Sequence, residues 1–200
     1  MLLLAFLIVG FGLRSAKGTS EYKPEEQNDP QIYEAALKMV SMNSTLRLLM
    51  FSRGFENKIP QCLFSKFLLN EESGPVRTLQ TDFINNKTSF PQLNSTVHVT
   101  VSNSTPPYLQ INFKEVSGHY DSNWTYAQDL KYANAEECIL LQDASGKLTP
   151  APCTLWGYGL SDNCRERFKQ MCGAGNLVNL TQCTQDEKKK GEDTLMIPQC

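Results

Sequence analysis

The sequence predicts an all-β fold, an eight-stranded antiparallel barrel with a short N-terminal helix and a C-terminal helix packed outside it. Eight short segments, apolar or alternating between apolar and polar residues, follow one another at nearly regular spacing with turn-forming residues between them. Such spacing is typical of a barrel or a sandwich, and we favour the closed barrel. Only 40% of the 200 residues are apolar and seven are cysteine, so we expect disulfides to support a modest core.

The segment 1–16 has the pattern of a secretory signal peptide. Its first twelve residues are almost all apolar, and small residues follow at Ser15, Ala16 and Gly18. The run is too short to span a bilayer, and its lack of amphipathic spacing disfavours the alternative, a buried helix. We therefore expect cleavage near Ala16 or Gly18 and an extracellular protein. No later stretch is long and apolar enough for a membrane anchor, so we expect no membrane association.

The remainder of the chain divides into three parts by composition. Residues 17–30 are polar and charged and predict a loose N-terminal segment. Residues 31–185 contain all the strand patterns and form the predicted barrel domain. Residues 186–200 are rich in charge and predict a solvated tail.

A short helix is expected just before the first strand. Asp29 is a candidate N-cap and Pro30 fits the first helical position. The apolar residues that follow at helical spacing are Ile32, Ala35, Ala36, Met39 and Val40. We expect this helix to act as a lid or plug of the barrel.

The eight predicted strands are 45–51, 61–69, 76–83, 95–102, 108–116, 123–132, 137–141 and 153–158. Alternation is clearest in the fourth and fifth, which place one row of apolar side chains on a single face: Val97, Val99, Val101, Leu109, Ile111 and Phe113. A second helix is expected from Ser161 to about Met171. Ser161 or Asp162 would cap its start, and Gly173 would end it.

The charge and motif content argue against several function classes. With 19 basic and 21 acidic residues the net charge is −2, which disfavours a nucleic-acid-binding protein. The only histidines are His98 and His119, and no G-x-S-x-G elbow or P-loop is present, so we expect no enzyme and no catalytic residues. No C-x-x-C pair occurs and no cysteine lies near a histidine, so we expect neither a metal site nor a cofactor.

Six N-glycosylation sequons agree with a secreted protein: Asn43, Asn86, Asn94, Asn103, Asn123 and Asn179. Glycans at these positions would either only solubilise the protein or mask it from a host.

A barrel of eight strands can enclose about one small ligand. Aromatic side chains in the predicted strands are either core residues or candidates for ligand contact: Phe67, Phe83, Phe113, Tyr126 and Trp156. Arg47 lies on one face of the first strand. If it points inward it could hold a fatty-acid carboxylate, and if it points outward it is a surface charge.

The cysteines lie at positions 62, 138, 153, 164, 172, 183 and 200, which fits three disulfides and one remaining cysteine. Their spacing alone leaves the pairing open. The runs Cys138-Ile-Leu-Leu, Cys153-Thr-Leu-Trp and Cys164-Arg-Glu-Arg-Phe, followed by Cys172 and Cys183, resemble the salivary lipocalins of ticks, the histamine-binding protein family. The earlier run Asn43-Ser-Thr-Leu-Arg-Leu-Leu-Met-Phe is similar to the opening of that family, and the resemblance covers roughly residues 30–185.

This resemblance implies a lipocalin barrel and a specific set of disulfides. By analogy with the family, the pairs would be Cys62–Cys183, Cys138–Cys164 and Cys153–Cys172. Cys200 would then be unpaired, capped or bonded to another molecule.

The resemblance also implies a function, the sequestration of a small host inflammatory mediator by a secreted, monomeric protein that thereby modulates host defence. Members of the family bind histamine, serotonin or leukotrienes, and some block complement, so an inhibitor of host immune proteins is the alternative. Amine binders carry acidic residues at the positions of Ile139 and Thr154, because a buried ammonium needs a carboxylate. We therefore expect a lipid mediator rather than an amine, unless Asp82 or Asp129 points inward.

Overall fold

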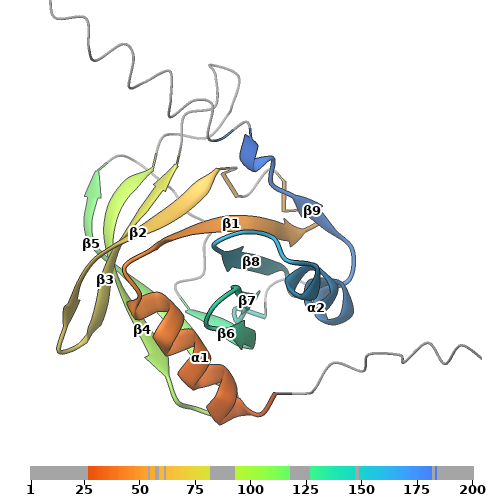
Figure 1. Cartoon of the computed structure of the whole chain (residues 1–200), viewed down its shortest axis with the longest axis horizontal. Coiled ribbons are helices and arrows are strands. Elements are labelled where there is room, and N and C mark those ends of the chain that lie inside the picture. The colour runs from red at the N-terminus through yellow and green to blue at the C-terminus, as the bar shows by residue number, and fades with distance from the viewer. Residues whose placement is uncertain are drawn as a thin grey trace, which may run out of the picture.

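The computed structural model describes residues 27–53, 55–56, 59–60, 62–81, 93–117, 127–146, 149–181 and 183, and it confirms the all-β fold (Figure 1). Its elements in chain order are α1 (Asp29–Ser41), β1 (Thr45–Ser52), β2 (Leu63–Glu71), β3 (Gly74–Thr81), β4 (Asn94–Ser102), β5 (Tyr108–Ser117), β6 (Ala127–Asn134), β7 (Cys138–Asp143), β8 (Cys153–Gly157), α2 (Asp162–Cys172) and β9 (Gly175–Leu177). The predicted signal peptide and the charged tail lie outside the described residues.

The strands form a closed ring, which settles the choice between barrel and sandwich. The sheet order is β2-β3-β4-β5-β6-β7-β8-β1, and β1 pairs with β2 to close it. All these pairings are antiparallel. At the seam, β1 places Thr45 opposite Lys66 of β2 and Leu48 opposite Trp156 of β8. The predicted eight-stranded barrel is therefore confirmed.

Most strand ends differ from the prediction by one or two residues, and two differences have a clear physical reason. A short additional strand, β9, pairs with the end of β1 and was not predicted, because three residues are too few to show an alternating pattern. The second strand begins at Leu63 rather than at residue 61, since Cys62 has φ of 60°, outside the strand region. The predicted strand residues 82–83 and 123–126 lie outside the described part of the chain.

The nearly continuous apolar run of β1 is explained by burial on both of its faces. Leu48 and Phe51 belong to the cluster inside the barrel, whereas Leu49 and Met50 belong to a second cluster beneath α2. The register of β1 against β8 shifts between Leu48 and Met50, at the point where neighbouring side chains of the strand pack into different clusters. A strand that is covered on both faces does not need to alternate.

Helix α1 lies across one end of the barrel and plugs it, as predicted (Figure 1). Its N-cap is Asn28 rather than Asp29, because Asn28 forms a capping box with Gln31, with hydrogen bonds of 3.0 Å in both directions. Four of its side chains are buried in the main core: Ile32, Ala36, Met39 and Val40. Just before the helix, the amide of Gln27 donates to the carbonyl of Ala133 in β6 at 2.9 Å.

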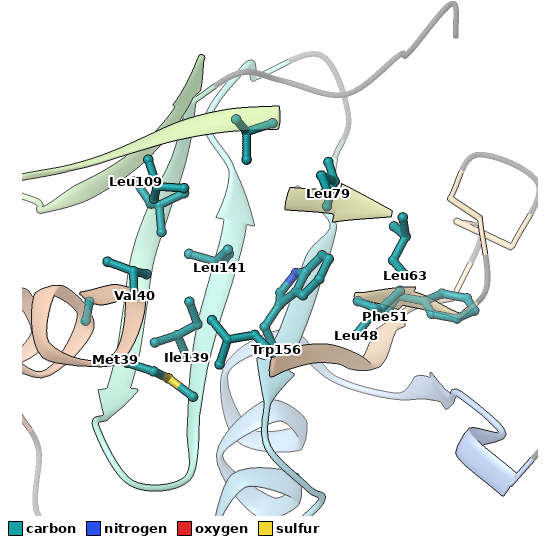
Figure 2. Packing of buried hydrophobic residues seen from close by; sticks show 14 of the residues in the cluster. Met39, Val40, Leu48, Phe51, Leu63, Leu79, Leu109, Ile139, Leu141 and Trp156 are labelled. Carbon is teal, nitrogen blue, oxygen red and sulfur yellow. The ribbon is translucent and has the colours of Figure 1, made fainter. Parts of the chain in front are cut away.

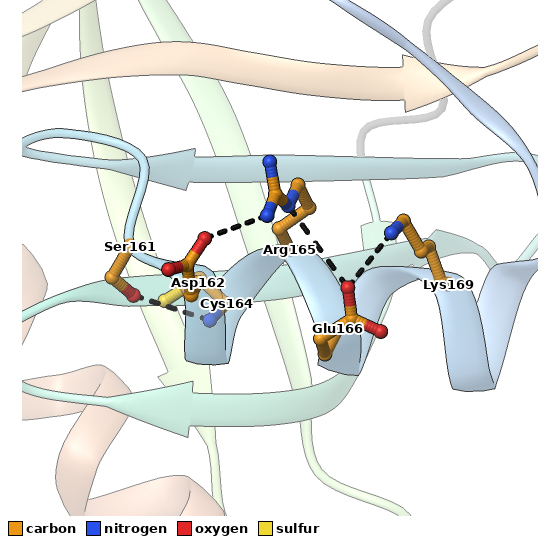
Figure 3. A network of polar contacts seen from close by, with 6 residues as sticks. All are labelled: Ser161, Asp162, Cys164, Arg165, Glu166 and Lys169. Carbon is orange, nitrogen blue, oxygen red and sulfur yellow. Dashed lines mark hydrogen bonds and ion pairs between the residues drawn. The ribbon is translucent and has the colours of Figure 1, made fainter.

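Helix α2 packs outside the barrel, also as predicted. Ser161 caps it by accepting a hydrogen bond from the Cys164 amide, and Gly173 ends it with a positive φ of 76°. Phe168 is fully buried against the outer faces of the strands. The opposite face of the helix carries exposed ion pairs of Arg165 and Lys169 with neighbouring carboxylates (Figure 3). These exposed pairs contribute little to stability.

Within the described residues, three disulfides join six of the seven cysteines in the pairs that the family resemblance implied, and Cys200 lies outside these residues. Cys138–Cys164 and Cys153–Cys172 attach α2 to β7 and β8. Cys62–Cys183 joins the start of β2 to the segment after β9, across 121 residues. The crowding of cysteines in the last third of the chain thus fixes α2 and the C-terminal segment to the barrel wall.

Candidate binding cavity

A cavity of about 50 Å³ lies inside the barrel. Its lining residues come from α1 and all eight strands of the barrel: Val40, Leu46, Ser65, Arg77, Leu79, Val97, Val99, Leu109, Ile111, Gln128, Ile139, Leu141 and Trp156. Figure 2 shows Val40, Leu109, Ile139, Leu141 and Trp156 gathered from these different elements. At about 10–15 Å³ for each water, the space holds about three to five waters, so a larger molecule must push side chains apart.

The apolar walls follow from strand alternation. Val97 and Val99 of β4 and Leu109 and Ile111 of β5, which the alternation placed on one face of each strand, line the cavity. The intervening side chains face outward, where Gln110 donates to Asn112 at 3.2 Å. The period of two residues therefore decides which side chains meet a ligand.

Trp156 provides an aromatic wall in β8. In the sheet it lies between Leu48 of β1 and Ile139 of β7. Its indole Nε1 donates to the hydroxyl of Thr154 at 3.2 Å, so its polar group is satisfied within the barrel. The ring therefore contributes an apolar surface to the cavity.

Arg77 of β3 is the most unusual residue of the cavity wall, since it is only 1% exposed. Its Nε donates to Ser65 Oγ at 3.0 Å, and its Nη2 donates to the carbonyls of Ser44 and Ser65 at 2.6 and 3.0 Å. Its Nη1 donates to the carbonyls of Val40 and Met42 at 2.8 and 3.2 Å. All five N–H groups of the guanidinium are thus occupied.

Arg77 remains a cation without a carboxylate among the residues that line the cavity. Burial lowers the pKa of its guanidinium to about 10, so the group keeps its charge at neutral pH. The carbonyls of Val40 and Met42 belong to the C-terminal end of α1, where the helix dipole favours positive charge. Arg77 therefore holds the end of the plug helix in place.

Gln128 of β6 is the second unusual polar residue of the wall. Its side chain is 5% exposed and lines the cavity. Its Oε1 is buried and has no hydrogen-bond partner within the described residues. An amide oxygen buried without a partner costs free energy, so a hydroxyl or other donor placed in the cavity would be stabilised there.

Of the six predicted ligand-binding residues, one lines the cavity, three do not, and two lie outside the described residues. Trp156 lines the cavity, whereas Phe67, Phe113 and Arg47 are not among its lining residues. Phe67 lies 5.9 Å from the Arg77 guanidinium, and Arg47 stands 5.5 Å from the centre of the Phe64 ring. Phe113 packs against the main core. The remaining two, at positions 83 and 126, lie outside the described residues.

Sequence reasoning missed Arg77 and Gln128, although a signal was present. Arg77 lies two residues before the apolar Leu79, and Gln128 lies two residues before Leu130, so each shares a strand face with a core residue. A polar residue in an inward row of a barrel strand is a candidate for ligand contact.

No carboxylate lines the cavity within the described part of the chain. Ile139, at one of the positions where amine binders carry an acid, contributes an apolar wall, and Thr154, at the other, accepts from Trp156. Asp129 follows the inward Gln128 in β6 and is not a lining residue, and Asp82 lies outside the described residues.

Four predicted glycosylation sites fall in the described part of the chain and are exposed: Asn43, Asn94, Asn103 and Asn179. Attached glycans stay a prediction, and the sites at 86 and 123 lie outside the described residues. In the same part of the chain, no helix is long and apolar enough to cross a membrane. No cluster of three or more metal-binding side chains occurs there either.

Comparisons with known proteins find similar structures but no similar sequences. No protein-family model and no curated protein matches the chain. Japanin from the tick Rhipicephalus appendiculatus, solved bound to cholesterol, superposes with a TM-score of 0.56 at 15% identity, over 70% of this chain and 94% of that one. Lobster apocrustacyanin A1 gives a TM-score of 0.49 at 12% identity, over 82% of this chain and 92% of that one. The likeness to Japanin agrees with the lipocalin-type barrel that the sequence resemblance implied.

Proposed function

We propose that this chain is a secreted salivary lipocalin of the tick type that binds and sequesters a small apolar host mediator inside its barrel. The observation that carries the proposal is the cavity itself, closed at one end by α1 and walled almost entirely by apolar side chains. Apolar walls with a few well-placed polar groups are typical of small-molecule sites. The cholesterol bound to Japanin is an example of such a ligand in a barrel of the same fold.

A lipid fits this cavity better than a biogenic amine. Histamine and serotonin carry an ammonium group, which loses its hydration on burial and needs a carboxylate in return. The cavity wall carries the cation Arg77 and no carboxylate in the described residues. A buried ammonium would therefore meet the charge of Arg77, and the neutral amide oxygen of Gln128 does not replace a carboxylate.

The volume of about 50 Å³ requires that the cavity widens when a lipid binds. Pockets for drug-sized ligands are about 300–1,000 Å³. A lipid must therefore displace apolar side chains into other rotamers, which disturbs their packing but breaks no side-chain hydrogen bond. The binding free energy is reduced by the cost of this rearrangement.

The proposal is tested by titrating the purified full chain with cholesterol, leukotriene, histamine and serotonin. The Trp124→Phe background leaves Trp156 as the only indole, so its fluorescence reports on the cavity. We expect a lipid to bind in a 1:1 complex, detected by native mass spectrometry, and the amines to leave the fluorescence unchanged.

Two substitutions in β4 test the location of the site. One is on the cavity wall, and the other is its matched control on the outer face. Val99→Phe adds bulk to the cavity wall and is expected to weaken lipid binding by at least tenfold. Thr100→Phe makes a comparable change on the outer face of the same strand and should leave binding intact. Failure of every lipid to bind would contradict the carrier function and favour the alternative, a protein-binding inhibitor of complement or another immune protein.

A further inference from the structure

We propose that Gln128 orients the ligand and that the cavity selects a neutral lipid bearing a hydroxyl group over a fatty acid. This inference rests on the proposed function and gives it a ligand chemistry. It follows from a contrast between two polar side chains of the wall. Gln128 has a buried oxygen without a hydrogen-bond partner, whereas every N–H group of the Arg77 guanidinium already has one.

Gln128 offers an unused acceptor inside the barrel. Its Oε1 is buried without a partner, in a side chain that is 5% exposed and lines the cavity. An amide oxygen is an acceptor only, so the group that completes it must donate a hydrogen. A hydroxyl is the simplest donor that an otherwise apolar ligand can carry without a charge.

Arg77 offers no unused donor. A carboxylate is usually recognised through two parallel N–H···O bonds from a guanidinium. Here all five N–H groups already donate to Ser65 and to the carbonyls of Val40, Met42 and Ser44. A fatty acid could bind this guanidinium only by breaking bonds that hold α1, and a carboxylate without such bonds loses its hydration for charge attraction alone.

The expected order of affinity is therefore alcohol, then a lipid with no donor, then carboxylate. A hydrogen bond to Gln128 that the first can make and the second cannot corresponds to about a tenfold difference in affinity. The carboxylate should bind most weakly because the donors of Arg77 are already occupied, and the single neutral amide of Gln128 cannot compensate the lost hydration of a full charge.

The experiment uses three probes with the same alkyl chain: dodecan-1-ol, its methyl ether and dodecanoate at pH 7.5. Affinities are measured by Trp156 fluorescence in the full chain with Trp124→Phe, and stoichiometry by native mass spectrometry. We expect dodecan-1-ol to bind about tenfold more tightly than the ether, and dodecanoate to bind most weakly. In Gln128→Leu the preference for the alcohol over the ether should fall to within about twofold, with ether binding retained. Gln110→Leu, the same change on an outward side chain, should keep the full preference.

The outcomes separate this inference from the proposed function. Equal binding of all three probes would leave the carrier function standing and overturn the role of Gln128. Tightest binding of dodecanoate would also overturn it and would assign ligand recognition to the charge of Arg77. If no probe binds, the carrier function fails and the inference fails with it.

Discussion

Arg77 is the residue on which the closed end of the barrel depends most. Its guanidinium joins β2, through Ser65, to the end of α1 and the turn that follows, through the carbonyls of Val40, Met42 and Ser44. The carbonyl of Met42 also accepts from the Ser44 amide at 2.8 Å, whereas the carbonyl of Val40 lies in the last turn of α1, where the intrahelical donors run out. One buried cation therefore satisfies a helix end that would otherwise be costly to bury.

Replacing Arg77 tests this role directly. Arg77→Met keeps most of the volume but removes all five hydrogen bonds, so we expect the free energy of unfolding to fall by about 3 kcal/mol or more. Chemical denaturation provides the measurement. Arg165→Met removes an exposed ion pair with Asp162 and should cost less than about 1 kcal/mol. Comparable losses in the two variants would contradict the structural role of Arg77.

At the scale of residues, alternation predicts which residues of β4 and β5 share a face, but it does not predict which polar residues matter. Val97 and Leu109 fall on the face that lines the cavity because a period of two is a local property of the chain. The partners of Arg77 lie 33 to 37 residues away, apart from Ser65, and no local pattern encodes them. Arg47 was considered for the cavity because its charge was visible, yet it stands over Phe64.

Among the elements, the two helices and eight strands could be predicted because each has its own caps, turns or periodicity. β9 could not, because its three residues become a strand only by pairing with the end of β1. The N-cap of α1 was misplaced by one residue, since both Asn28 and Asp29 are good caps and only Asn28 reaches Gln31. The pairing of the cysteines was implied by family resemblance, not by spacing.

The disulfides are expected to differ in how much they stabilise the barrel. The loop-entropy relation gives about 5 kcal/mol for Cys62–Cys183, which closes 121 residues, and about 3 kcal/mol for Cys153–Cys172, which closes 19. Double replacement of each pair by alanine, followed by chemical denaturation, measures the two losses. A larger loss for Cys153–Cys172 would show that attachment of α2 to β8 outweighs loop length.

For the whole molecule, ligand binding should appear as added stability. A ligand at about 100 times its Kd raises the free energy of unfolding by about 2.7 kcal/mol, which corresponds to an increase in Tm of about 5–11 °C for a chain of this size. At the same concentration, dodecan-1-ol should produce this shift in the wild-type chain and at most about half of it in Val99→Phe, whose affinity is expected to be at least tenfold lower. Equal shifts in the two proteins would place the bound alcohol outside the cavity.

The position of β1 at the seam of the barrel has a consequence for how the chain acquires its structure. β1 pairs with β8, and the amide of Cys153 donates to the hydroxyl of Ser52, a residue 101 positions earlier. Pairings of such long range slow folding, because a large loop must close before any contact rewards it. During synthesis β1 therefore cannot pair with β8 until β8 has been made, and Cys62 cannot bond to Cys183 until later still. The ring can close only after β8 has been synthesised, so closure of the barrel comes late, whereas the sequential strand pairs from β2 to β8 are of shorter range.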